Sequence, residues 1–138
     1  LPKIINDYCS TLDLMPTILD YLKIEKNNPV DGISLLQKIV GDDRKVIEDR
    51  FLISETGGVT GPFPSPYRPN VYSCINYPWK LIYYTKTGKF EYFNINDDPN
   101  ELNPLSYKKG TFKECYNKMM EYIFSNYRME SSEYYHRI

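Results

Sequence analysis

The sequence contains few of the residues that usually carry metal or nucleophilic chemistry. It has one histidine, His136, which lies in a polar segment near the end of the printed sequence. A histidine that acts as acid or base needs a rigid position, so we interpret His136 as a solvated residue. The cysteines number three and are widely spaced, at Cys9, Cys74 and Cys115. An odd number at this spacing argues against a disulfide framework and a zinc site, and predicts reduced, partly buried thiols.

Net charge and long apolar runs are also lacking. Lysine and arginine number 17 against 18 aspartate and glutamate, which gives a net charge of −1. A nearly neutral chain has no overall electrostatic attraction to nucleic acid or to an anionic membrane, so we expect neither as a partner. The apolar runs fall far short of the ~20 residues that a membrane-spanning helix needs. These features predict a soluble protein; the compartment stays open, with the cytoplasm favoured because the cysteines are unpaired.

Aromatic residues are plentiful, with 14 tyrosines, 6 phenylalanines and 1 tryptophan. The densest aromatic and β-branched segments are 79–85 and 90–95, a composition typical of strands. The polar segment 86–89 lies between them and contains a glycine, so we predict a hairpin with Ile82 opposite Phe93. Both faces of this hairpin carry apolar side chains, and neither face is therefore expected to be left in water.

Two segments have the apolar spacing of amphipathic helices. In residues 10–22, Ser10 or Thr11 can cap the start and Pro16 falls in the first turn, so we predict a buried helix there. A second helix should begin at a capping box in residues 111–114. Its apolar face comprises Phe112, Cys115, Tyr116, Met119, Ile123 and Tyr127.

The segments 51–54 and 71–76 predict two more strands, which would pair with the hairpin. Between them the segment Thr56–Asn70 is rich in glycine and proline, and we predict a long loop. The fold class expected from these elements is α+β. It consists of a small antiparallel sheet of about four strands packed against a C-terminal helix, with two further helices at the N-terminal end.

The end of the hairpin leads into the segment 98–101, which has the residues of a helix start. Asp98 can cap a helical turn, Pro99 suits its first position, and Glu101 can reach back to the amide of the cap. We therefore predict a capping box that closes the hairpin.

Residues 92–105 read Y-F-N-I-N-D-D-P-N-E-L-N-P-L. This segment resembles the L-Y-D-L-x-x-D-P-x-E-x-x-N-L signature near the C-terminus of type I sulfatases, members of the alkaline phosphatase superfamily. Tyr92, Asn94 and Pro104 depart from that pattern. The positions that agree are Phe93, Ile95, Asp98, Pro99, Glu101 and Leu105. The signature belongs to the scaffold of that family and not to its catalytic residues.

Two earlier segments resemble sulfatase landmarks in the same order. Residues 29–36 are similar to the landmark P-x-D-G-x-S-L-x-P-x-L-x-G, with a turn at Gly32 and with Ser34 as the cap of a short helix that ends at Gly41. Residues 10–22 are similar to S-x-x-D-x-x-P-T-L-L-D-L, which in that family directly follows the catalytic core. We interpret Asp13 in this segment as a helix cap and not as a metal ligand. The agreeing positions are Ser10, Asp13, Pro16, Thr17, Leu19 and Asp20.

The resemblance implies an active site whose central parts this sequence does not contain. Sulfatases form their nucleophile from Cys or Ser in a C/S-x-P-x-R motif, converted to formylglycine, and hold a calcium-class divalent ion with Asp and Asn side chains. No cysteine here lies in such a motif, and Pro64–Arg68 has proline in place of the nucleophile. The acidic pairs 42–43 and 97–98 are interpreted as solvated. We assign no catalytic, cofactor-binding or metal-binding residue to this sequence.

The resemblance implies that residues 1–138 are the C-terminal subdomain of a sulfatase. Residues 1–45 would be helical and continue from a missing catalytic domain, 46–105 would hold the strands and the loop, and 106–138 the C-terminal helix and tail. The intact protein would hydrolyse the sulfate monoester of a small molecule or saccharide. This part would supply scaffold, pack against the catalytic domain and, on its own, self-associate through exposed apolar surface.

Within the loop Thr56–Asn70, Arg68 is the one arginine, and a guanidinium suits the oxygens of a sulfate ester. Tyr67 beside it could stack on a sugar or aryl group, so both are candidate substrate-binding residues. Two alternatives stay open. One is a phosphonate, phosphodiester or phosphoglycerol ester as substrate in the same superfamily. The other is a free-standing module whose aromatic strands bind bases or sugars, against which the lack of a basic stripe argues.

Overall fold

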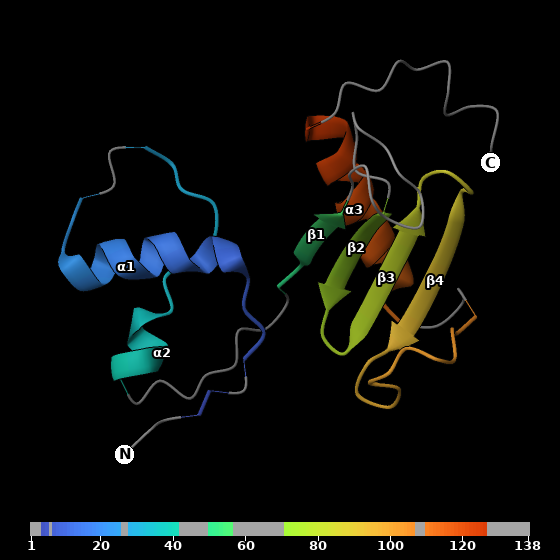
Figure 1. Cartoon of the computed structure of the whole chain (residues 1–138), viewed down its shortest axis with the longest axis horizontal. Coiled ribbons are helices and arrows are strands. Elements are labelled where there is room, and N and C mark those ends of the chain that lie inside the picture. Colours follow the sequence, from blue (N-terminus) through green and yellow to red (C-terminus); the bar gives the residue numbers. More distant parts are fainter. Residues whose placement is uncertain are drawn as a thin grey trace. The chain divides into compact units, whose positions relative to one another are not determined.

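A computed structural model describes residues 4–5, 7–25, 28–41, 50–56, 71–106 and 110–126. The chain divides into two compact units, unit 1 (Leu1–Glu48) and unit 2 (Asp49–Ile138), and each is described by itself (Figure 1). The assignment of residues 1–138 to one subdomain stays a prediction.

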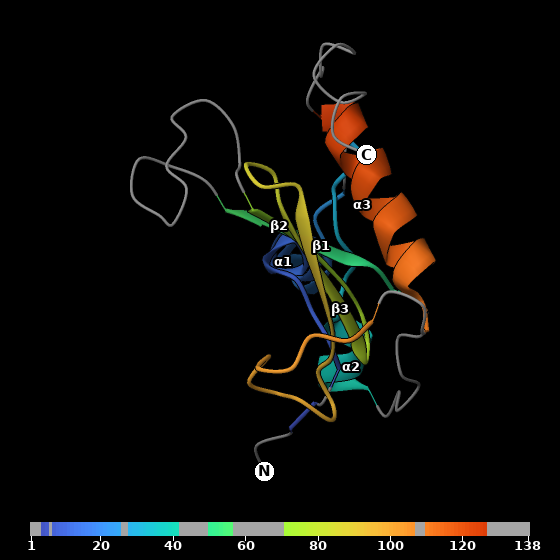
Figure 2. The same cartoon turned by 90° about the vertical axis from the view of Figure 1, so that its right-hand side faces the viewer.

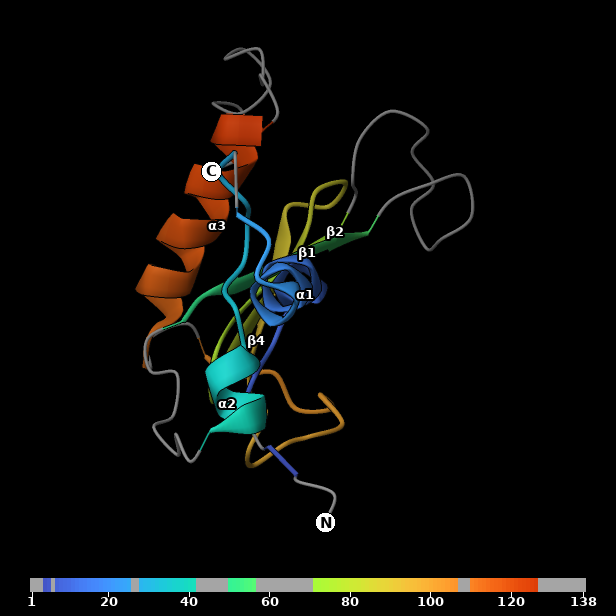
Figure 3. The same cartoon turned by 90° about the vertical axis from the view of Figure 1, so that its left-hand side faces the viewer.

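Unit 2 contains the four-stranded antiparallel sheet that the sequence predicts (Figure 1). Its strands follow one another in space as they do in the chain, in the order β1-β2-β3-β4. The strands are β1 (Leu52–Thr56), β2 (Val71–Asn76), β3 (Trp79–Tyr84) and β4 (Lys89–Asn94). The helix α3 (Phe112–Asn126) lies along one face of the sheet, as Figures 2 and 3 both show. The predicted α+β class is therefore confirmed.

The register of the hairpin differs from the prediction by two residues. Ile82 lies opposite Glu91 and not opposite Phe93. The cause is the loop, which comprises residues 85–88 and places Gly88 at its last position with a φ of 68°. The Gly88 amide donates to the carbonyl of the last β3 residue at 2.9 Å, a backbone conformation that glycine adopts without strain. Because the shift is an even number, every side chain keeps its predicted face.

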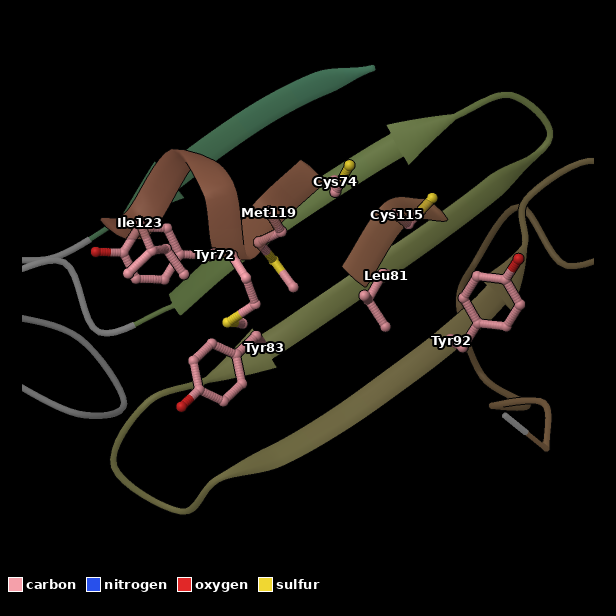
Figure 4. Close-up of a cluster of buried hydrophobic side chains, with 9 residues drawn as sticks. Tyr72, Cys74, Leu81, Tyr83, Tyr92, Cys115, Met119 and Ile123 are labelled. Carbon is pink, nitrogen blue, oxygen red and sulfur yellow. The ribbon is translucent and has the colours of Figure 1, made fainter. Parts of the chain in front are cut away.

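The core of unit 2 lies between the sheet and α3 (Figure 4). Side chains alternate across a strand, so every second residue of β2, β3 and β4 points towards the helix. The rings of Trp79 and Tyr92 stack with centroids 5.5 Å apart, and Phe112 meets Tyr92 edge-on at the same distance. The predicted helix face is confirmed for its described members, while Tyr127 lies outside the described residues. The buried cluster comprises Tyr72, Cys74, Leu81, Tyr83, Tyr92, Cys115, Met119, Met120 and Ile123.

Unit 1 contains a 3-10 turn η1 (Thr11–Asp13), the helix α1 (Leu14–Leu22) and the short helix α2 (Leu36–Val40). Ser10 is the N-cap of the turn, and a capping box between Ser10 and Asp13 is formed. The predicted cap is therefore confirmed. The chain ends α1 with Lys23 in the left-handed conformation, at a φ of 56°.

The prediction that the first helix is buried is wrong. Pro16 is the one buried residue of α1, whereas Met15, Ile18 and Leu22 expose 58%, 55% and 55% of their surface. The polar Asp13, which directly precedes the helix, is buried instead. The physical reason is that α2, with five residues, offers too little apolar surface to cover a full helical face. The apolar face of α1 is therefore left on the outside.

Candidate functional site

The predicted substrate-binding residues Tyr67 and Arg68 lie outside the described residues, and their contacts stay a prediction. The strand ends on either side of their loop are described. Thr56 pairs with Val71, so the two residues that flank the segment 57–70 are neighbours in the sheet. Val71 in turn pairs with Tyr84 of β3, which places Tyr84 at the same end of the sheet.

A tyrosine, a glutamate and a lysine form a hydrogen-bonded group at this end, on the sheet face opposite α3. Tyr84 donates its hydroxyl to Glu91 Oε2 at 2.9 Å, and Lys89 Nζ lies 2.6 Å from Glu91 Oε1. The hydrogen bond from Lys89, followed by the one from Tyr84, lowers the pKa of Glu91. Burial and the neighbouring Glu91 raise the pKa of Tyr84. At neutral pH the lysine and glutamate charges cancel, so this group can orient a polar ligand but carries no excess charge for an anion.

The signature segment that follows β4 does not form the predicted capping box. Asp98 accepts a hydrogen bond from the amide of Asn103 at 2.8 Å, and the segment contains turns in place of a helix. Glu101 has a φ of 56°, and its carboxylate binds Lys80 Nζ with both oxygens, at 2.7 and 2.8 Å. A charged partner on β3 replaces the cap amide, because a charge-assisted bond is stronger than one to a neutral amide. The prediction is therefore wrong, although Asp98 does stabilise a turn.

The Lys80–Glu101 pair ties the segment after β4 back to the middle of the sheet. The two side chains expose 20% and 30% of their surface, so the pair is largely shielded from water. Lys80 lies opposite Phe93, which is buried on this face at 2% exposure. Sequence reasoning missed Lys80, because no local pattern links residues that are 21 positions apart. In this structure the signature glutamate has a scaffold role.

In unit 1, polar side chains of residues 10–22 bind backbone amides of the segment that begins at residue 29. Asp13 Oδ2 accepts from the Ser10 amide at 2.8 Å, while its Oδ1 accepts from the Ile33 amide at 2.9 Å. Thr17 Oγ1 donates to the Asp13 carbonyl and accepts from the Leu35 amide at 2.9 Å. Asp13 is fully buried, and both of its oxygens are occupied by backbone amides. The interpretation of Asp13 as a cap is confirmed, and the second bond extends its role to the neighbouring segment.

The described residues do not fit a divalent metal ion. Within the ranges that the structure describes, no three side chains of histidine, cysteine, aspartate or glutamate gather into a group that could hold one. Asp97, one of the acidic residues considered above, accepts from the side-chain amides of Asn94 and Asn96 at 2.7 and 3.2 Å. The pair at 42–43 and His136 lie outside the described residues. We therefore assign no step of a reaction to a metal ion in this chain.

Comparison with solved structures shows the same fold in sulfatases. A 2-O GAG sulfatase matches 83% of this chain with a TM-score of 0.63 and 23% sequence identity. A putative sulfatase from Bacteroides thetaiotaomicron matches 83% with a TM-score of 0.60 and 22% identity. A protein in complex with its substrate D-glucosamine-2-N,6-O-disulfate matches 82% with a TM-score of 0.57 and 20% identity. At these identities the likeness shows the fold alone.

The match covers only part of those proteins, 24%, 24% and 22% of their respective chains. No protein-family model matches this chain, and no curated protein matches it in sequence. The described helices are all too short, or too polar, to cross a membrane. The fold of this chain therefore matches a part of the sulfatase structures that makes up about a quarter of their length. This agrees with the resemblance of its three sequence segments to sulfatases.

Proposed function

We propose that this chain is the C-terminal part of a sulfatase and that the intact protein hydrolyses a sulfate monoester on a saccharide. The observation that carries the proposal is the fold match over 83% of the chain to sulfatase structures. The substrate class rests on the 2-O GAG sulfatase and on the protein bound to a disulfated glucosamine. The formylglycine nucleophile and a calcium-class ion would come from the remainder of the intact protein, which would also be the partner of this chain.

The role of unit 1 in this proposal is to dock onto that remainder. Its segments are held to one another by polar contacts, namely the bonds of Asp13 and Thr17 and the Lys38–Asp7 ion pair at 3.0 Å. The buried apolar cluster, in contrast, lies entirely in unit 2. Most of the large apolar side chains that the described residues expose belong to unit 1, among them Leu12, Leu14, Met15, Ile18, Tyr21 and Leu22. A face of this kind is expected to be covered in the intact protein.

The same exposed face makes a prediction for the isolated chain. We expect it to bind an environment-sensitive apolar dye and to self-associate at micromolar concentration, because α1 leaves its apolar face in water. Substituting Met15 and Ile18 by serine should reduce both signals. A monomeric chain that binds no dye in light scattering and fluorescence measurements would contradict the docking role.

The loop that contains Tyr67 and Arg68 would contribute to the rim of the substrate cleft. Arg68 would bind the oxygens of the sulfate ester, since a planar guanidinium can donate two parallel hydrogen bonds. Tyr67 would stack on the sugar ring. The Lys89–Glu91 pair at the adjoining sheet end is charge-balanced, so the loop arginine is the better candidate for an anion.

Two alternatives predict other results. Phosphonate, phosphodiester or phosphoglycerol hydrolysis uses the same fold superfamily, and the ester preference of the intact protein distinguishes it. A free-standing aromatic module is less favoured, because Tyr72, Tyr83 and Tyr92 are buried against α3 and offer no ring face for stacking.

The experiment that tests the proposal is a comparison of esters with the intact protein. We expect turnover of a sulfated glycosaminoglycan disaccharide and of an aryl sulfate, with phosphodiester turnover at least a hundredfold slower. A reversed preference would contradict sulfatase activity while leaving the fold assignment in place. The printed chain alone should not hydrolyse an aryl sulfate in the presence of calcium, and activity that survives repurification would show that it is catalytically complete.

The role of the loop is tested by substituting Arg68 in the intact protein. Arg68→Ala should lower kcat/KM on the saccharide substrate at least several-fold without changing Tm, and Arg68→Lys should recover only part of the loss. Lys86→Ala, which removes an exposed positive charge from the β3–β4 loop, serves as the matched control and should have no effect. Full activity of Arg68→Ala would remove this loop from the substrate site.

A further inference from the structure

Two cysteines that the proposed function does not use lie together in the core of unit 2. Cys74 lies on β2 and Cys115 on α3, and both are fully buried. They belong to the same buried cluster, and Figure 4 shows both sulfur atoms directed to the same side of it. The two thiols are close enough that each shifts the pKa of the other. The two cysteines are 41 positions apart in the sequence, and they bring β2 and α3 together.

The surroundings of the two thiols are unequal. Cys115 lies in the first turn of α3, where the helix dipole favours negative charge. The neighbouring Cys74 thiol lowers the pKa of Cys115, with smaller contributions from the Thr111 side chain and the Asn76 backbone, and together they outweigh the opposite effect of burial. The neighbouring Cys115 and then burial raise the pKa of Cys74. Cys115 is therefore the better nucleophile, and Cys74 stays protonated beside it.

We propose that Cys74 and Cys115 are a redox pair that closes to a disulfide between β2 and α3, and so sets the stability of the unit 2 core. Because both side chains are fully buried, the oxidant must be small, and hydrogen peroxide is a suitable class. The Cys115 thiolate attacks one peroxide oxygen, giving a sulfenic acid and, after protonation, one water. The Cys74 sulfur then attacks the Cys115 sulfur, its proton leaves with the hydroxyl group as a second water, and the disulfide forms.

The consequence is a covalent link across the two layers of unit 2. A disulfide between these positions closes a loop that includes β3, β4 and the segment leading to α3, which restricts the unfolded chain. The link adds a covalent bond to the packing between the sheet and the first turn of α3. Reduced unit 2 would then be the less stable form, and oxidised unit 2 the more stable one.

The test uses the full chain with Cys9→Ser, because Cys9 is the exposed thiol and would otherwise react first. After exposure to hydrogen peroxide, we expect intact-mass measurement to show the loss of two hydrogen atoms and a non-reducing peptide map to show a Cys74–Cys115 link. The Tm should rise by about 5 °C or more, and dithiothreitol should reverse both changes.

Three results would overturn the proposal. They are a mass gain of oxygen atoms without loss of hydrogen, a disulfide that joins two chains, and a link that leaves Tm unchanged or lower. Cys74→Ala in the Cys9→Ser background should abolish the mass loss. If that variant fails to fold, the mass and peptide map of the Cys9→Ser chain still decide the question.

Discussion

At Asp13 a single carboxylate sets the local structure of unit 1. It caps the turn that begins α1 and also holds the amide of Ile33, which lies 20 positions further on. The turn that brings Ile33 there depends on Gly32, whose φ is 89°. A Cβ at Gly32 would lie 2.4 Å from the carbonyl oxygen of Leu12. The Asp13 carboxylate can therefore bind the Ile33 amide only because Gly32 has no side chain to collide with the Leu12 carbonyl.

We predict that Gly32→Ala breaks the contacts between residues 10–22 and the segment that contains Ile33 and Leu35. The substitution adds strain at a positive φ and a collision with backbone, which together cost about 1–3 kcal/mol. The amides of Ile33 and Leu35, which bind Asp13 and Thr17, should lose at least tenfold of their hydrogen-exchange protection. Gly88→Ala is the control for the strain of a positive φ alone, because φ there is 68° and a Cβ meets nothing within 4 Å. Unchanged protection in Gly32→Ala would show that the turn can be rebuilt without glycine.

The ion pair between Lys80 and Glu101 makes a second prediction at the residue scale. Lys80→Met and Glu101→Gln should each destabilise unit 2, and a double-mutant cycle should give a coupling energy of about 1 kcal/mol, because the pair is bidentate and mostly shielded. The Lys118–Glu121 pair on α3 is more exposed, at 53% and 67%, and should couple by less than about 0.5 kcal/mol. Equal coupling in the two cycles, measured by denaturant unfolding, would deny the scaffold role of the signature glutamate.

At the scale of elements, the predictions that succeeded rest on local pattern. The strands were recognised by aromatic and β-branched density, and α3 by apolar spacing that its cluster of Cys115, Met119 and Ile123 confirms. One error has a non-local cause: the capping box failed because Lys80 attracts Glu101 from a distant strand, which no local sequence window contains. The error in the hairpin register has a local cause, because the loop comprises residues 85–88 and places Gly88 last.

The same limits apply to the candidate site. Tyr67 and Arg68 were chosen from residue chemistry within one loop, and they stay predictions. The structure adds two interactions between segments about 20 positions apart. In one the Leu35 amide donates to Thr17 Oγ1, and in the other Lys80 donates to Glu101. The resemblance to sulfatase landmarks marked three of these four residues as part of a pattern, but the pattern did not reveal what they contact.

The packing of α3 on the sheet makes a prediction for this element. Met119 is fully buried between the helix and the strands, so Met119→Ala should destabilise unit 2 by about 2–5 kcal/mol through the cavity that it leaves. Asn117 lies on the exposed side of the same helix, and Asn117→Ala should change stability by less than about 0.5 kcal/mol. Similar effects of the two substitutions in denaturant melts would place the core elsewhere.

At the scale of the whole molecule, the two units differ in how they are held together. Every residue of the buried apolar cluster belongs to unit 2, where a sheet and a helix enclose it. Among the described residues of unit 1, the buried ones are Asp13, Pro16 and Lys38, and their contacts are largely polar. Since apolar burial is the main favourable contribution to folding, the described part of unit 1 has little of the principal source of stability that unit 2 has. This agrees with the proposal that the apolar face of unit 1 is covered by the remainder of the intact protein.

This difference predicts that unit 2 folds without unit 1. A polypeptide of residues 49–138 should unfold cooperatively, with a Tm within a few degrees of that of the full chain, because its cluster is intact. A polypeptide of residues 1–48 should show no cooperative transition in calorimetry, since its helices are nine and five residues long and expose their apolar faces. In the full chain, hydrogen exchange of the α1 amides should be much faster than that of the β3 amides. A cooperative transition of residues 1–48 alone would show that the polar contacts of Asp13, Thr17 and Lys38 are sufficient to fold it, and would remove the need for a covering surface.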